Sequence, residues 1–218
     1  MSTISLIQQR RAELRRRLDV AKQFEQLEES CIPSYVHGNP AAAGVAWLRL
    51  LTAARLFKRY APPGPALDFG SAAGELYHTI KLHEHVEPDY HFCELNDALI
   101  KALLEMNPKA KRIHLESMPP QRFSAIFALD SLEHNDNVAE LLDLLLKGLA
   151  PNGVFILSGP TENWLYRTGR KIAGFSGHYH KTTISNIEEV FATRMTLVAR
   201  QHIPFGVPLF SVSVWKRK

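Results

Sequence analysis

The stretch Ala66-Leu-Asp-Phe-Gly-Ser-Ala-Ala-Gly74 decides the fold of this chain. An apolar run ends in an acid, Asp68. A tight turn that contains Gly70 and Gly74 follows, and a helical pattern begins at Glu75. Glycine lets a backbone pass close to a ligand and adopt conformations that a Cβ disfavours, and the free N–H groups of a helix N-terminus attract a carboxylate or a phosphate. The order strand, glycine-rich turn, helix therefore predicts a nucleotide-cofactor cradle.

The position of the acid separates two classes of cofactor. A dinucleotide site has the pattern G-x-G-x-x-G, because a pyrophosphate sits on the turn. Here Asp68 stands two residues before Gly70, where it would repel a diphosphate, and no second glycine lies at the dinucleotide spacing. The same acid can pair with the α-ammonium of S-adenosylmethionine, which has a ribose and no phosphate. The spacing favours S-adenosylmethionine, and an ordinary turn of an α/β domain is the alternative.

Further acids follow the next apolar runs. Residues 90–94 read as a short strand that ends in Glu94, where an acid accepts ribose hydroxyls in sheets of this type. Leu95 is placed to pack on the adenine. Residues 112–117 read as a third strand ending in an acid, and residues 123–134 as a buried strand that runs into a loop. The pattern places three strand ends around one ligand.

In the rest of the chain, segments with the periodicity of helices alternate with segments typical of strands. This alternation predicts that these segments complete a mostly parallel sheet that binds ligands at the carboxyl ends of its strands. The last two strands should form an antiparallel hairpin at the edge of the sheet. The predicted segments are helices at 41–60, 136–149 and 184–193 and strands at 153–158, 195–202 and 209–216.

With these motifs in this order, the chain resembles the class I S-adenosylmethionine-dependent methyltransferases, in particular the small-molecule branch called type 11 or UbiE-like. The resemblance covers about residues 41–216. It rests on residues 66–74, Glu94, Leu-Asp-Ser-Leu-Glu-His at 129–134 and Leu-Lys-Gly-Leu-Ala-Pro-Asn-Gly-Val-Phe-Ile-Leu at 146–157. The family usually has a glycine where this chain has Ala72, whose methyl group modestly reduces the expected affinity. It often has Asp in place of Glu94 or Glu116.

The resemblance implies a Rossmann-like, seven-stranded, mostly parallel sheet with helices on both faces and an antiparallel last strand. We expect a methyltransferase domain at 41–218 and an N-terminal helical extension or lid at 1–40, in which Tyr35 and His37 either close over the cofactor or are surface linker residues. The implied cofactor is S-adenosylmethionine, and the residues expected to bind it are Asp68, Gly70, Ser71, Ala72, Gly74, Glu94, Leu95, Glu116, Ser117, Leu129 and Asp130.

The acceptor end of the site is expected in residues 159–181, because long connections at the ligand end of a sheet are usually functional. This segment is expected to form a cap. Its cations Arg167, Arg170 and Lys171 either meet an anionic group of the acceptor or are solvated. The residues expected to bind the acceptor are Trp164, Tyr166, His178 and Tyr179, and the candidates for a general base or an electrostatic partner are His134, His180 and Asp130.

The expected reaction is in-line methyl transfer to an oxygen or nitrogen of a small molecule, with positioning as the main source of rate. A methyltransferase acting on RNA or protein is an alternative. It would be favoured by an Asn/Asp-Pro-Pro-Tyr/Phe sequence after the fourth strand, where this chain has Asp130-Ser-Leu-Glu133. A non-catalytic cofactor-binding protein of the same fold is a second alternative, which Ala72 favours and the acids Asp68 and Glu94 oppose.

The composition limits which partners, cellular location and metal content we expect. A net charge of +4 with both signs mixed along the chain permits a nucleic-acid partner without favouring one. Cys31 and Cys93 are too few for a disulfide framework, so we expect reduced thiols and a cytoplasmic location. No apolar run is long enough to span a membrane, and we expect a monomer or a homodimer. The pairs His83/His85, His178/His180 and His114/Glu116 do not converge at metal spacing, so no metal is expected.

Overall fold

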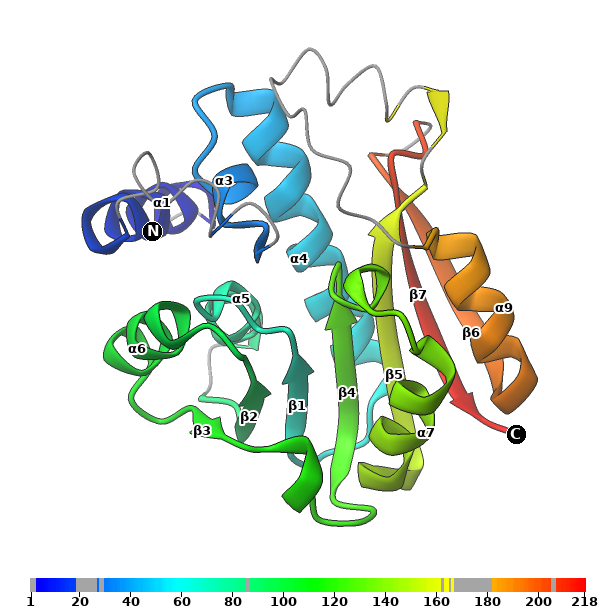
Figure 1. Ribbon diagram of the computed structural model, residues 1–218. Coiled ribbons are helices and arrows are strands. Elements are labelled where there is room, and N and C mark those ends of the chain that lie inside the picture. Colours follow the sequence, from blue (N-terminus) through cyan, green and yellow to red (C-terminus); the bar gives the residue numbers. More distant parts are fainter. Residues whose placement is uncertain are drawn as a thin grey trace.

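A single mixed sheet organises the chain (Figure 1). The computed structural model describes residues 3–18, 27, 30–84, 87–161, 163, 164, 166, 182–204 and 207–218. The strand order is β3-β2-β1-β4-β5-β7-β6, and β7 runs antiparallel to both of its neighbours. This confirms the predicted seven-stranded sheet. The strands are β1 (Ala66–Phe69), β2 (Tyr90–Cys93), β3 (Lys111–Arg112), β4 (Phe123–Leu129), β5 (Leu149–Pro160), β6 (Met195–Ile203) and β7 (Phe210–Arg217).

Helices cover both faces of this sheet (Figure 1). Every residue of β4 is buried, as is usual for a central strand of a parallel sheet. Its Phe127 packs with the core formed by α4, α5 and α6, and its Ile126 packs with the core formed by α7 and α9. The helices are α1 (Thr3–Arg17), α3 (Ile32–Tyr35), α4 (Pro40–Tyr60), α5 (Glu75–Glu84), α6 (Asp97–Met106), α7 (Val138–Gly148) and α9 (Ile184–Arg194).

The third strand is shorter than predicted. The sequence indicated a strand over 112–117, but β3 covers only Lys111–Arg112, and Leu115–Ser117 form a 3₁₀ helix. Within the described ranges, β2 is the only strand beside β3. It ends at Cys93, and the Ile113 N–H donates to the Phe92 carbonyl at 2.9 Å. Without a longer partner the chain turns away. Glu116 is therefore carried by a 3₁₀ turn and not by a strand end.

The N-terminal segment packs on the ligand end of the sheet (Figure 1). Leu14 and Leu18, which recur at helical spacing, are buried in the core shared with α4 and α5. Helix α4 begins at an Asn39 cap, whose side chain accepts the Ala41 N–H at 2.9 Å. Figure 1 shows α1 and α3 on the side of the molecule toward which the carboxyl ends of β1 and β2 point.

Candidate cofactor and acceptor site

A cavity of about 560 Å³ lies at the carboxyl ends of β1, β2 and β4. Its volume falls within the range that small-molecule sites usually have. Side chains from the turn after β1, from the end of β2 and from the loop after β4 line it. Of the residues predicted from sequence, those that line it are Asp68, Gly70, Ser71, Ala72, Glu94, Leu95, Glu116, Leu129, Asp130 and His134.

The turn after β1 uses its glycines for two different purposes. Gly70 has a φ of +72°, and a Cβ there would lie 2.5 Å from the Cβ of Ser131, so only glycine fits between the turn and the β4 loop. Gly74 has a φ of +85° and does not line the cavity. A Cβ at this position would approach Leu103 and Asn107 to 2.9 Å. Gly74 therefore permits close packing of the turn on α6.

Ala72 occupies the left-handed region with a φ of +48°. A residue with a side chain is held in this region only by its surroundings, at a cost of about 1–3 kcal/mol. The Ala72 N–H donates to the Glu94 carboxylate at 2.9 Å, and the carbonyl of the next residue, Ala73, accepts from Arg10 at 3.1 Å. The turn therefore keeps its shape although alanine replaces the family's usual glycine.

The Glu94 side chain, at the end of β2, is hydrogen-bonded to this turn and to the residues that follow it. One of its oxygens accepts the Ala72 N–H, and the other accepts the Leu95 N–H at 2.8 Å and the Asn96 N–H at 2.9 Å. Leu95 is 95% exposed at the rim. Ser117, expected beside the cofactor, does not line the cavity, and its hydroxyl donates to the His114 carbonyl at 3.2 Å.

Asp68 is a buried carboxylate that accepts a hydrogen bond from the Tyr90 hydroxyl. Burial raises the pKa of Asp68 to about 7, the Tyr90 hydrogen bond opposes this shift, and the Glu94 and Glu75 carboxylates add to it. A cation placed beside Asp68 would favour its ionised form. The cavity thus contains an acid whose charge is poorly compensated.

Glu75 and Arg10 form a buried ion pair next to the turn. Glu75, the first residue of α5, lines the cavity and is 1% exposed. Burial raises the pKa of Glu75, and the neighbouring Arg10 guanidinium opposes that shift from 3.3 Å. Neither residue was predicted from the sequence, although an acid directly after Gly74 was a visible signal.

Asp130 lines the cavity and is held by several partners. It has a φ of +54°, and its carboxylate forms an ion pair with the buried Arg49 of α4. The Ser158 hydroxyl donates to it at 3.1 Å, and the Cys31 thiol lies 3.8 Å away. Arg49 also donates to the Tyr35 hydroxyl at 2.8 Å. Burial raises the pKa of the Cys31 thiol, so that thiol is neutral.

A family model described as a methyltransferase domain matches residues 45–205. The chain belongs to the class I S-adenosylmethionine-dependent methyltransferase family. Its fold is similar to that of a TehB-like SAM-dependent methyltransferase from Corynebacterium glutamicum (18% identity, TM-score 0.56, 83% of this chain and 100% of that one). It is also similar to the PH0226 protein from Pyrococcus horikoshii (14% identity, TM-score 0.66, 85% of this chain and 96% of that one). A third protein of similar fold is the glycopeptide N-methyltransferase MtfA complexed with S-adenosylmethionine (14% identity, TM-score 0.59, 78% of this chain and 94% of that one). No curated protein matches this chain.

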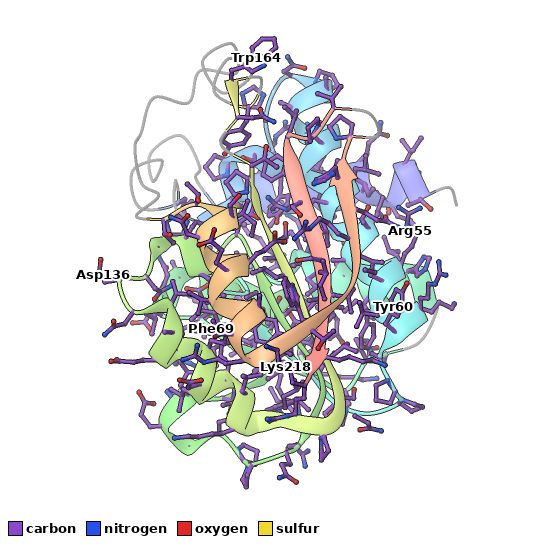
Figure 2. All side chains as sticks on the ribbon, turned by 90° about the vertical axis from the view of Figure 1, so that its right-hand side faces the viewer. Arg55, Tyr60, Phe69, Asp136, Trp164 and Lys218 are labelled. Carbon is purple, nitrogen blue, oxygen red and sulfur yellow. The ribbon has the colours of Figure 1, made fainter. Side chains whose placement is uncertain are left out.

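The described residues do not bring two of the expected acceptor contacts to this cavity of the methyltransferase. Trp164 and Tyr166 are not among the residues that line the cavity. Trp164 is 69% exposed at the upper rim of the molecule in Figure 2, and the Tyr166 ring packs edge-on against Phe210 at 5.4 Å. The expected residues His178, Tyr179 and His180 and the cations Arg167, Arg170 and Lys171 lie outside the described residues.

Several wall residues of the methyltransferase were missed. The segment around α3 contributes two of them, Ser30 and Cys31. Of the two candidates that the sequence suggested in this connector, Tyr35 lines the cavity and is buried, and His37 does not line it. Among the described residues, no group of three or more His, Cys, Asp and Glu side chains has a metal-binding arrangement. No helix in the described ranges is both long enough and apolar enough to cross a membrane. The other polar wall residues that were missed are Asn96, Arg112, His114, Ser131 and Asn135.

Proposed function

We propose that this chain transfers the methyl group of S-adenosylmethionine to an oxygen or nitrogen atom of a small-molecule acceptor. The observation that carries the proposal is that Asp68, Glu94 and Asp130, from three neighbouring strand ends, line one cavity of about 560 Å³. When bound, S-adenosylmethionine supplies an activated methyl group on a sulfonium. Membership of the family supports S-adenosylmethionine as the donor.

The cofactor end fits the donor by charge and by hydrogen-bonding capacity. Burial and the nearby Glu94 and Glu75 carboxylates raise the pKa of Asp68, and an α-ammonium placed beside it would favour its ionised form. A carboxylate has about four acceptor sites, and Glu94 gives three of them to backbone N–H groups. The remaining capacity suits a ribose hydroxyl. In this proposal, Leu95 provides an apolar surface for the adenine.

At the acceptor end, Asp130 orients the nucleophile and His134 handles its proton. The carboxylate of Asp130 is paired with Arg49, which favours its charged form and makes it a weak proton acceptor. It can still accept a hydrogen bond from an O–H or N–H of the acceptor. His134 lines the same cavity, and an imidazole is the usual general base near neutral pH. Most of the rate then comes from holding the nucleophile in line with the methyl group.

The wall from the α3 segment favours a small acceptor over a macromolecule. Cys31 and Tyr35 line the cavity next to Asp130, so this end is walled by side chains on more than one side. Both cysteines are free thiols, which supports the proposed cytoplasmic location. The sequence-based expectation that His178, Tyr179 and His180 contact the acceptor is kept as part of this proposal.

Label transfer tests the proposal. The purified chain is incubated with S-adenosylmethionine labelled on its methyl group and with separated small-molecule, RNA and protein fractions of a cell extract. We expect label in the small-molecule fraction, and none with the double variant Asp68→Asn/Glu94→Gln. Label in RNA or protein would support a macromolecular acceptor. Tight binding of the donor without label in any fraction would support a non-catalytic binding protein.

A further inference from the structure

One arginine reaches from the N-terminal helix into the core behind the cofactor turn. Arg10 of α1 is only 2% exposed, which is rare for an arginine. Its guanidinium donates to the Ala73 carbonyl at 3.1 Å and to Glu75 at 3.3 Å, and it also donates to Glu13 of its own helix at 3.2 Å. Residues more than sixty positions apart are therefore joined at the turn that begins α5.

This contact falls on the strained part of the turn. Ala72 has a φ of +48°, and its own N–H is held by Glu94. One residue further along the chain, the Ala73 carbonyl is held by Arg10. The turn is thus held at the left-handed residue itself from the end of β2 and one residue later from α1. Such a conformation persists only when its surroundings over-determine it.

The same guanidinium also balances a charge inside the cavity. Glu75 lines the cavity, and its Oε2 atom is buried with no hydrogen-bond partner in the described parts of the chain. Arg10 is the cation that opposes the rise in the pKa of Glu75. Without this cation, Glu75 would be a second uncompensated carboxylate near Asp68. A buried, uncompensated carboxylate moves toward water or takes up a proton, and either change would displace the start of α5.

We propose that Arg10 is a positioning residue for S-adenosylmethionine. It acts through Ala73 and Glu75 and holds residues 70–74 in the conformation that receives the amino-acid part of the donor. Helix α1 is therefore part of the cofactor site and not a detachable cover. Arg11 and Arg15 of the same helix bind the carbonyls of residues 35–37, which extends this support to the acceptor wall. The inference rests on the proposed use of S-adenosylmethionine.

Isothermal titration calorimetry with three probes tests this role. The probes are S-adenosylmethionine, S-adenosylhomocysteine and 5′-methylthioadenosine, which lacks the amino-acid part. For Arg10→Met we expect the Kd of the first two to rise about ten-fold or more, while the Kd of 5′-methylthioadenosine changes less than about two-fold. The matched control is Arg17→Met, which removes an exposed arginine of the same helix that pairs with Glu13 and Glu105. It should leave all three Kd values unchanged.

The variant Arg10→Met/Glu75→Gln separates positioning from mere stability. Removing both charges should restore the melting temperature toward that of the parent, but the Ala73 carbonyl still lacks its donor, so the affinity for S-adenosylmethionine should stay low. Glu75→Gln alone keeps this donor and should bind more tightly than the double variant. Full recovery of affinity in the double variant, or an equal loss for all three probes, would overturn the positioning role. If the parent binds neither S-adenosylmethionine nor S-adenosylhomocysteine, the proposed function itself fails.

Discussion

The guanidinium of Arg49 and the carboxylate of Asp130 form an ion pair inside the core, with side chains 2% and 5% exposed. Arg49 comes from α4, and Asp130 follows the end of β4 at the wall of the cavity. The guanidinium also stacks over the Phe210 ring at 5.1 Å. The pair therefore joins a helix, the central strand and the start of β7, and it fixes the carboxylate that we assign to the acceptor.

Removal of Arg49 should destabilise the fold strongly. Arg49→Met leaves Asp130 buried without its cation, and breaking a buried pair in this way costs about 3–5 kcal/mol of unfolding free energy. Urea denaturation measures this loss. Arg49→Met/Asp130→Asn should recover much of it, and Arg194→Met, which breaks the exposed pair with Asp143, should change little. An Arg49→Met variant as stable as the parent would show that the buried pair is unimportant.

Asp68 should lower the stability of the unliganded protein at high pH. The pKa of Asp68 is raised to about 7 in the fold, compared with 3.8 for the reference group. At pH values between these two pKa values, the folded state binds more protons than the unfolded state, so the free energy of unfolding falls as the pH rises. Asp68→Asn should therefore be more stable than the parent at pH 8 by up to about 4 kcal/mol. The difference should disappear near pH 4, and a pH-independent difference would contradict the account.

Tyr90→Phe should shift the pH dependence of cofactor binding. The Tyr90 hydroxyl stabilises the charged form of Asp68, so its removal raises the pKa of Asp68 further. If the ionised carboxylate receives the donor's ammonium, the affinity for S-adenosylmethionine falls as the pH drops below the pKa. The midpoint of this fall should lie at higher pH in Tyr90→Phe than in the parent. An unchanged midpoint would separate Asp68 from the ammonium.

Ala72→Gly should relieve strain in the turn. Glycine adopts positive φ without the penalty of a Cβ, and Ala72 has a φ of +48°. We expect a gain of about 1 kcal/mol in unfolding free energy, at the low end of such strain, and equal or slightly tighter binding of S-adenosylmethionine. Chemical denaturation and calorimetry measure the two effects. A loss of stability would mean that the Ala72 methyl group contributes more through packing than it costs in backbone strain.

The sequence predicted what short-range chemistry determines. The strand, turn and helix at residues 66–84 and the apolar run of β4 were recognisable because their spacing and burial follow from local rules. The length of β3 was not, because it depends on where β2 ends. Arg10 and Arg49 were missed for a related reason. A buried arginine has no local signature, and its partners lie 65 and 81 residues away along the chain.

Glu94→Ala should weaken the cofactor complex. This carboxylate holds three backbone N–H groups at the rim and is assigned to the ribose. Losing a charged acceptor costs about 1.5–3 kcal/mol, or roughly ten- to a hundred-fold in Kd. Glu105→Ala on the exposed side of α6 is the control. Unchanged affinity in Glu94→Ala would remove the residue from the cofactor site.

Calorimetric titration of the unmodified chain with S-adenosylmethionine and with S-adenosylhomocysteine tests the central claim most directly. Our account predicts that both bind at one site per chain, and that adding either ligand abolishes the destabilisation by ionised Asp68 at pH 8. Absence of heat and of thermal stabilisation with both ligands would contradict the assignment of this cavity to S-adenosylmethionine.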